Sequence, residues 1–289
     1  MRTATDTSPR SAAIPGLIGI GVALLLYAIF RWWGFLVLFP WIGSAISVGI
    51  LIDRRLARNR KGIGRRIALL LNVPALLLFV PIANNENLQL EGIVLLLSIG
   101  FFGKGVIHYA VAKVFGPLVW GQGFCSWGCW TAAILEWLPL PEAGRTPKRL
   151  KSLRYLALAL SIGLPLALIL AAGFDVRQQY FRKQEMLWMF AGNGVYYLLA
   201  VPLAFWFKDR RAFCKIICPV ALIMKVPTAF RRLRMRPTAV DCVQCGVCTL
   251  VCPMEVQVMD AIAAGRDVGD TECIHCGACR NRCPVGAIC

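Results

Sequence analysis

The sequence predicts an all-α polytopic membrane bundle with an internal two-helix repeat, followed by a small cysteine-rich domain. Two observations lead to this fold class. Of the 289 residues, 58% are hydrophobic and the mean hydropathy is +0.63, which is too apolar for an ordinary soluble domain. The chain also holds 13 cysteines, and eight of them follow a doubled motif after residue 237.

About six transmembrane helices are expected, because apolar stretches near the roughly 20 residues that span a bilayer recur along the chain. They lie at about 14–30, 34–52, 67–83, 91–112, 154–174 and 186–207. The first two are the least distinct pair, since only "RWWG" separates them. The N-terminal segment lacks a short apolar core with a small-residue cleavage site, so the first span is expected to remain as an anchor. The expected organisation is a tail over 1–13, a membrane domain over 14–236 and a small domain over 237–289.

The net charge of +17 is concentrated in three segments that flank apolar spans. Residues 53–66 hold seven Lys or Arg, residues 145–154 hold five, and residues 208–236 hold nine. The loop "NNENLQLE" at 84–91 has none. The sequence is thus expected to be a multi-pass protein of a bacterial inner membrane. The positive-inside rule places both termini and the basic segments on its cytoplasmic side. Lipid head groups are the expected partners of these charges, and nucleic acid is not.

A doubled motif occupies the end of the chain: "CVQCGVCTLVCP" at 242–253 and "CIHCGACRNRCP" at 273–284. Both copies read C-x2-C-x2-C-x3-C-P, the spacing by which two-cluster ferredoxins hold [4Fe–4S] cubanes, with the fourth cysteine ligating the other cluster. The expected ligands of the first cluster are Cys242, Cys245, Cys248 and Cys283. Those of the second are Cys273, Cys276, Cys279 and Cys252. Zinc knuckles also use C-x2-C, but they do not need this register.

Two residues of uncertain role accompany the motif. His275, between two of the ligands, is expected to be a solvent-facing loop residue, with tuning of a potential as the alternative. Cys289 is left over once both clusters are complete, and we expect it to act as a small apolar residue. Because a cytoplasmic compartment keeps thiols reduced, disulfides are not expected.

A second repeat lies upstream, where "GFCSWGC" contains Cys125 and Cys129, and "AFCKIIC" contains Cys214 and Cys218. Alignment of the two copies gives F-C-x3-C-x2-A-x-I, within units over 67–138 and 154–226. Parallel repeats are related by an axis along the membrane normal, which would bring both pairs together at the cytoplasmic edge. Cysteines at i and i+4 share a helix face. A third metal centre held by these four thiolates is therefore expected, with buried inert cysteines or redox thiols as alternatives.

This cysteine architecture resembles the NapH/MauN family of membrane-bound ferredoxin-type proteins, and parts of it are similar to NosR and CcoG. The resemblance covers the chain from about residue 67 onward. One departure is that Trp130 follows Cys129, where the family has proline, as Pro219 follows Cys218. The resemblance implies electron transfer between the quinone pool and a partner redox enzyme. The protein would be a subunit of a membrane oxidoreductase complex and would carry no catalytic residue of its own.

Two further hypotheses concern quinone and function. Lys104 and His108 lie four residues apart in the fourth span, and we expect them near its cytoplasmic end, close to Tyr109 and Trp120. They are candidates for a quinone site, because ionisable residues in membrane spans often belong to functional sites. Snorkelling of the Lys104 side chain to the interface is the alternative to a quinone site.

The alternative function for the whole protein is that of an assembly or maturation factor whose clusters supply electrons for metal insertion into another enzyme.

Overall fold

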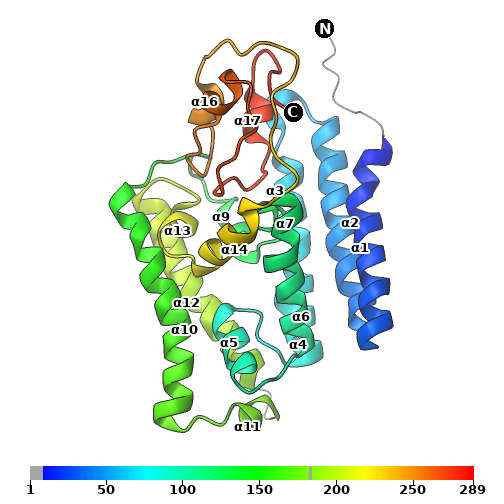
Figure 1. Ribbon diagram of the computed structural model, residues 1–289, viewed down its shortest axis with the longest axis vertical. Coiled ribbons are helices and arrows are strands. Elements are labelled where there is room, and N and C mark those ends of the chain that lie inside the picture. The colour runs from blue at the N-terminus through cyan, green and yellow to red at the C-terminus, as the bar shows by residue number, and fades with distance from the viewer. Residues whose placement is uncertain (1–8, 182–183) are drawn as a thin grey trace.

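The computed structural model describes residues 9–181 and 184–289, and in these residues every regular element is a helix (Figure 1). A single antiparallel bridge between Pro237 and Ile288 is the one strand-like pairing found there. Five helices are long and apolar enough to cross a membrane. They span Ser11–Phe30, Gly34–Arg55, Ile63–Ala83, Lys148–Ala172 and Gln184–Trp206. The all-helical membrane bundle predicted from the sequence is thus confirmed. The first eight residues of the predicted N-terminal tail lie outside the described residues, and α1 already begins at Pro9.

Helices α1 (Pro9–Phe30) and α2 (Gly34–Arg55) form a hairpin at one side of the bundle (Figure 1). Small residues allow their backbones to approach closely, as is common between membrane helices. A Cβ added at Gly19 would lie 2.4 Å from the carbonyl oxygen of Phe39, and one at Gly43 would lie 2.4 Å from that of Pro15. The hairpin confirms that "RWWG" separates two helices.

The third membrane passage is made of α3 (Ile63–Val73), the π-helical segment η2 (Pro74–Phe79) and α4 (Val80–Asn84). It leads away from the end of the bundle where the cysteine-rich domain lies (Figure 1). The wide turn of η2 starts at Pro74, which lacks the backbone donor that a regular α-helix would use.

The fourth passage differs from the predicted span at 91–112. Helix α5 (Leu90–Ser98) ends after nine residues, the segment from Gly100 to Gly103 is not helical, and a new helix begins at Lys104. That helix consists of α6 (Lys104–Ala110), the π-helical η3 (Val111–Phe115) and α7 (Gly116–Trp120). Gly100 adopts a φ of +68°, which favours glycine and ends α5. The prediction of one continuous helix over 91–112 is therefore wrong, and the part of the chain that the structure describes holds five membrane-length helices.

The two repeat units end in the same way. In the second unit, η4 (Lys148–Ser152) and α10 (Leu153–Ala172) run away from the cysteine-rich end, α11 (Val176–Phe181) turns, and α12 (Gln184–Trp206) returns (Figure 1). Each unit then ends in two short helices. These are α8 (Gly123–Trp127) and α9 (Trp130–Leu135) in the first unit, and α13 (Ala212–Ile216) and α14 (Pro219–Ala229) in the second.

The short helices exchange partners between the units. Helix α9 packs against α3 of its own unit and α12 of the other, while α14 packs against α10 of its own unit and η3 and α7 of the other. Each unit therefore completes the other, as expected for repeats related by an axis along the membrane normal.

The cysteine-rich domain covers the end of the bundle formed by α9, α13 and α14 (Figure 1). It contains only three short helices, α15 (Val247–Leu250), α16 (Val258–Ala263) and α17 (Ala278–Arg282). Its buried core combines apolar side chains such as Val256, Ile262 and Ile274 with cysteines of both motifs. The connections α2–α3, α9–α10 and α12–α15, which carry the three basic segments, all lie at this same end (Figure 1).

Candidate metal centres and their connection to the membrane domain

The structure gathers the motif cysteines around two cavities. The smaller is lined by Cys242, Cys245, Cys248 and Cys283. The larger is lined by Cys252, Cys273, Cys276 and Cys279. Each cavity thus takes three cysteines from one motif copy and the fourth from the other copy. This is the crossed grouping that the spacing predicts, and the ligation itself stays a prediction.

The two loops that surround the cavities have matching backbones. Gly246 and Gly277 both adopt left-handed φ angles, +74° and +73°, and each stands at the N-cap of the short helix that follows. Two residues before each glycine, Gln244 and His275 also have positive φ, 52° and 53°. Such angles bend the chain tightly between successive cysteines, and a side chain at either glycine would strain the turn.

The chemistry of both cavities fits an iron–sulfur cubane. Apart from the thiols, the cavity walls are mostly apolar, for example Met259 and Ile262 around one and Met254 and Val268 around the other. Among the described residues, no three His, Cys, Asp or Glu side chains converge closely enough for a single metal ion. A cubane needs a wider cage than a single ion, because each thiolate binds a different iron atom.

His275 does not face solvent as expected. Its carbonyl oxygen accepts a hydrogen bond from Nε1 of Trp127 at 3.3 Å, and the residue lines the larger cavity. Burial, with a smaller contribution from Arg231, lowers the pKa of His275 to about 4, so the imidazole is neutral at physiological pH. The reason for the difference is that this loop lies against the membrane domain. Cys289 is exposed, and its backbone pairs with Arg236.

The two C-x3-C segments have the same local structure, but it is not one continuous helix. Cys125 and Cys214 lie in short helices, α8 and α13, whereas Cys129 and Cys218 are the N-caps of α9 and α14 with extended ψ angles of 120° and 112°. In both copies the amide of the second cysteine bonds to the carbonyl of the buried phenylalanine before the first, at 3.0 Å. The expectation of two cysteines on one helix face is therefore wrong, because the helix breaks between them.

The Trp130 departure from the expected proline has little structural consequence. Trp130 occupies the first helical position of α9, as Pro219 does in α14. The amide of this position has no partner within the helix, so proline is tolerated there without being required. Trp130 uses its side chain instead, donating from Nε1 to Oδ1 of Asn193 at 2.7 Å.

The four C-x3-C cysteines come together at the end of the bundle that faces the cysteine-rich domain. All four are partly buried. Cys125 and Cys129 pack against the same core cluster as Val220 and Met224, which follow Cys218. Met224 places its thioether 3.8 Å from the sulfur of Cys125. The repeat therefore brings both pairs to the same end of the bundle, and a shared site there stays a prediction.

The first C-x3-C loop also touches the cysteine-rich domain directly. Trp127, between Cys125 and Cys129, donates to His275, between Cys273 and Cys276. Cys125 packs against the core of the cysteine-rich domain, and Nε2 of Gln122 donates to the carbonyl of Thr271 at 2.9 Å. The set containing Cys273 is thus the proximal set, next to the membrane domain. The set containing Cys242 is the distal set, and its Cys245 is exposed.

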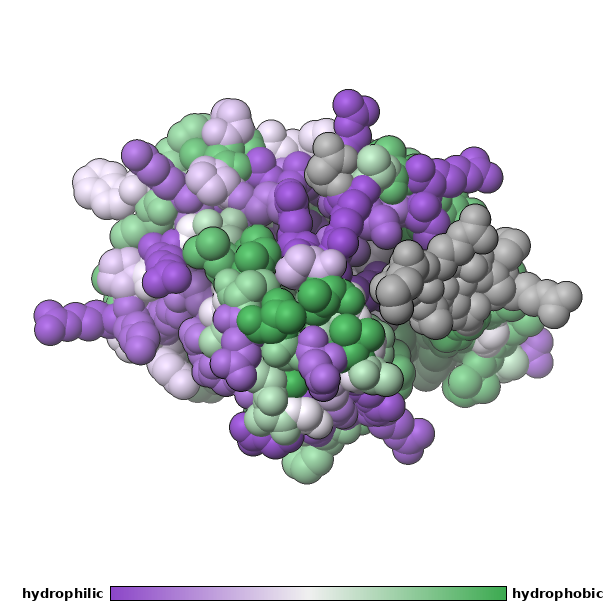
Figure 2. All heavy atoms as spheres, turned by 90° about the horizontal axis from the view of Figure 1, so that it is seen from above, coloured by the Kyte–Doolittle hydropathy of each residue, from purple (hydrophilic) through white to green (hydrophobic). Residues whose placement is uncertain are grey.

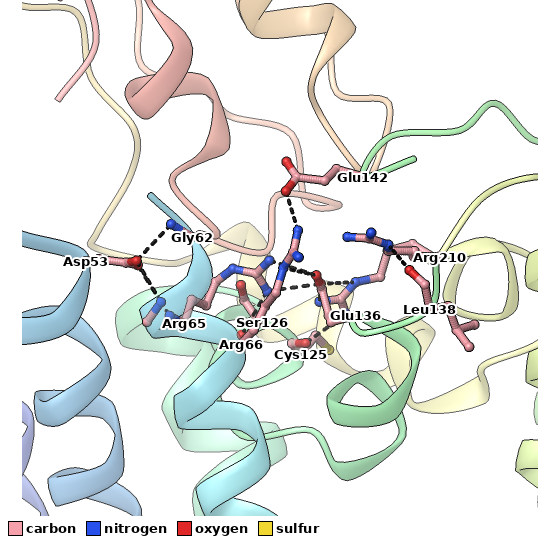
Figure 3. Close-up of polar contacts among 12 residues, drawn as sticks. Asp53, Gly62, Arg65, Arg66, Cys125, Ser126, Glu136, Leu138, Glu142 and Arg210 are labelled. Atoms are coloured by element: carbon pink, nitrogen blue, oxygen red, sulfur yellow. Dashed lines mark hydrogen bonds and ion pairs between the residues drawn. The ribbon is translucent and has the colours of Figure 1, made fainter. Parts of the chain in front are cut away.

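The buried carboxylate of Glu136 holds two arginines that bind the first C-x3-C loop. Glu136 accepts hydrogen bonds from Arg65 at 3.0 and 2.9 Å and from Nε of Arg211 at 3.0 Å (Figure 3). The same two arginines donate to the carbonyls of Ser126 and Cys125. Burial alone would raise the pKa of Glu136, but the two guanidinium groups hold it well below its usual range. Sequence analysis did not single out this triad, although an acid in the apolar "TAAILEW" was the available signal.

Acidic side chains of the cysteine-rich domain bind the basic segments of the membrane domain. Glu255 lies 2.8 Å from both Lys151 and Lys215, and Glu272 lies 2.8 Å from Arg154. Burial raises the pKa of Glu255, but hydrogen bonds from the two lysines outweigh it and lower this pKa to about 2. Part of the charge that the sequence assigned to lipid head groups therefore holds the two domains together.

Lys104 and His108 are not near the cysteine-rich end. Lys104 begins α6 beside Glu86 of the 84–91 loop, whose carboxylate accepts from the Lys104 amide at 3.1 Å. Trp120, at the other end of the same helical passage, is roughly 24 Å away at 1.5 Å per residue. His108 is buried with its ring 5.7 Å from that of Phe39. The predicted location at the end of the fourth span that carries the cysteine motifs is wrong, because a new helix begins at Lys104, after Gly103.

Comparison with known proteins agrees with this description. The family model described as "4Fe-4S dicluster domain" matches residues 241–288. The chain is 26% identical over 171 residues to the "Putative electron transport protein YccM" of Escherichia coli (strain K12), an alignment that covers 51% of this chain and 46% of that protein. The chain thus spans about half the length of the curated relative it matches. No solved structure matches the chain.

Fold, cavities and comparisons together define a class: a multi-pass membrane protein with a domain that carries two [4Fe–4S] clusters. The two cubanes of the dicluster domain supply the redox chemistry. The particular protein is a distant homologue of the Escherichia coli protein named above.

Proposed function

We propose that the protein relays electrons between quinone in the bacterial inner membrane and a partner redox enzyme. The observation that carries the proposal is the contact between Trp127 and His275, which joins the membrane domain to the loop of the proximal cysteine set. Electrons entering from the membrane would reach the proximal cluster first, then the distal cluster, then the partner. The resemblance to NapH/MauN proteins supports the same function.

The surface around the distal set supports an exit there. Seen from the cysteine-rich end, hydrophobic side chains gather in the middle of the face and hydrophilic ones surround them (Figure 2). In this domain Val240, Val243 and Leu250 are exposed, as is Cys245. An apolar centre with a polar rim is the usual anatomy of a protein–protein interface, so a partner subunit could approach the distal cluster closely.

The orientation belongs to the same proposal. With the basic connections on the cytoplasmic side, the clusters face the cytoplasm, the 84–91 loop faces outward, and lipid head groups bind the basic side chains left free by the domain contacts. Lys104 and His108 remain candidates for a quinone site at the outer half of the bundle.

The experiment that tests the relay uses the full chain in lipid nanodiscs with or without a long-chain quinone. Both clusters are reduced anaerobically with dithionite, the excess reductant is removed, and the recovery of cluster absorbance is followed. We expect fast reoxidation only in discs that contain quinone. Equal rates with and without quinone would refute quinone coupling.

A further inference from the structure

Lys113 is a buried cation without a carboxylate partner among the described residues. It lies in η3 and is only 6% exposed. Its Nζ lies 3.0 Å from the centroid of the ring of Phe124, the residue directly before Cys125 in sequence. The ring of Trp130, the residue directly after Cys129, lies 5.8 Å from the same Nζ, so Lys113 stands next to the neighbours of both cysteines of the first pair.

Arg211 brings further positive charge to the same place. It is 1% exposed and donates to the carbonyl of Cys125 at 2.9 Å. Its own charge is compensated by Glu136, which also pairs with Arg65. Within the described part of the chain, Lys113 is therefore left beside the C-x3-C cysteines without a carboxylate of its own.

Four neutral thiols would leave Lys113 uncompensated, and an unpaired buried charge is strongly unfavourable. Four thiolates that ligate an oxidised two-iron or four-iron cluster carry a net charge of −2, which would compensate it. A single tetrahedral metal ion would also be anionic with four thiolates, but it needs sulfurs about 2.3 Å from one centre. Among the described residues no such convergence is found.

We propose that Cys125, Cys129, Cys214 and Cys218 ligate a third iron–sulfur cluster, with Lys113 as its buried counter-ion. This goes beyond the proposed relay, which requires only the two clusters of the dicluster domain. The third cluster would lie between the membrane domain and the proximal cluster, because Cys125 packs against the core of the cysteine-rich domain. Lys113 favours the more negative, reduced form of the cluster and thus raises its midpoint potential.

Iron and acid-labile sulfide per chain in the anaerobically purified full-length protein test the ligands. Two cubanes account for about eight iron atoms, whereas a third cluster raises the total to about ten or twelve. Cys125→Ala and Cys214→Ala should each return the content to about eight and abolish the same spectroscopic signal. Cys289→Ala is the matched control, because this exposed cysteine lies outside all three sets, and it should keep the higher content.

The signals of the two remaining cubanes show whether each variant is folded. A wild-type protein with both cubanes full, about eight iron atoms and no signal sensitive to Cys214→Ala would overturn the third cluster. So would one zinc ion per chain that disappears in Cys214→Ala without loss of iron.

Redox titration tests Lys113. Lys113→Met should lower the midpoint potential of the third cluster and leave the other two potentials unchanged, while Lys113→Arg, which keeps the charge, should stay close to wild type. Equal potentials in wild type and Lys113→Met would refute the counter-ion role. This readout does not depend on quinone, so it separates the third cluster from the proposed relay.

Discussion

The indole nitrogen of Trp127 donates to the carbonyl oxygen of His275, 3.3 Å away, and so connects a C-x3-C loop of the membrane domain to a cluster loop. The two residues are 148 positions apart in sequence. Each lies between two cysteines of its own motif. Because electron transfer slows steeply with distance, a hydrogen bond that joins the two cysteine motifs is a favourable place for electrons to cross between the domains.

Trp127→Phe should slow electron exchange between membrane quinone and the clusters without loss of either cubane. The change removes the hydrogen bond, whose net contribution to domain docking is about 0.5–1.5 kcal/mol. The rate is measured as reoxidation by quinone in nanodiscs. Trp137→Phe is the control, since Trp137 is 47% exposed. Equal slowing in both variants would contradict a specific role for Trp127.

Removal of Cys248 or of Cys283 should affect the same cubane. The two cysteines line one cavity although they come from different motif copies. EPR of Cys248→Ala and Cys283→Ala should therefore show the same altered signal, with the signal of the cluster assigned to Cys273, Cys276 and Cys279 intact. A Cys283→Ala variant that perturbs this second signal would show that the ligation is not crossed.

Glu136→Gln should destabilise the membrane domain by about 3–5 kcal/mol, because it leaves Arg65 and Arg211 buried without their carboxylate. Glu142→Gln is the matched control. Glu142 pairs with Arg66 but its side chain is 46% exposed, so the cost should be about 0–1 kcal/mol. Unfolding in detergent measures both. Similar losses in the two variants would argue against the buried triad as a structural anchor.

Glu255→Gln should loosen the cysteine-rich domain from the bundle. It weakens the contacts to Lys151 and Lys215, at a cost of about 1.5–3 kcal/mol for a charged hydrogen-bonded group. Hydrogen exchange of residues 230–240 should increase. Asp267→Asn, which affects only the exposed pair with Arg236 at 3.5 Å, should leave exchange unchanged. Protection equal to wild type in Glu255→Gln would refute this docking contact.

The sequence was sufficient where spacing alone determines the outcome. Regular C-x2-C-x2-C-x3-C spacing predicted the grouping of Cys283 with the first motif, and the repeat predicted that the C-x3-C pairs meet. It was not sufficient for the fourth passage, because Phe101 and Phe102 continue the apolar run through the break at Gly100–Gly103. Hydropathy does not distinguish an apolar turn from an apolar helix. The partners of Glu255 and Glu272 were equally hidden, since they lie 40 or more residues away in sequence.

The account depends most on the order of the relay, in which the proximal cluster stands between the membrane and the distal cluster. The direct test compares two double variants in quinone-containing nanodiscs after dithionite reduction, one lacking the proximal cluster (Cys276→Ala with Cys279→Ala) and one lacking the distal cluster (Cys245→Ala with Cys248→Ala). The account predicts that the proximal cluster is still reoxidised by quinone when the distal cluster is absent, whereas the distal cluster stays reduced when the proximal one is absent. Fast reoxidation of the distal cluster without the proximal one would contradict it.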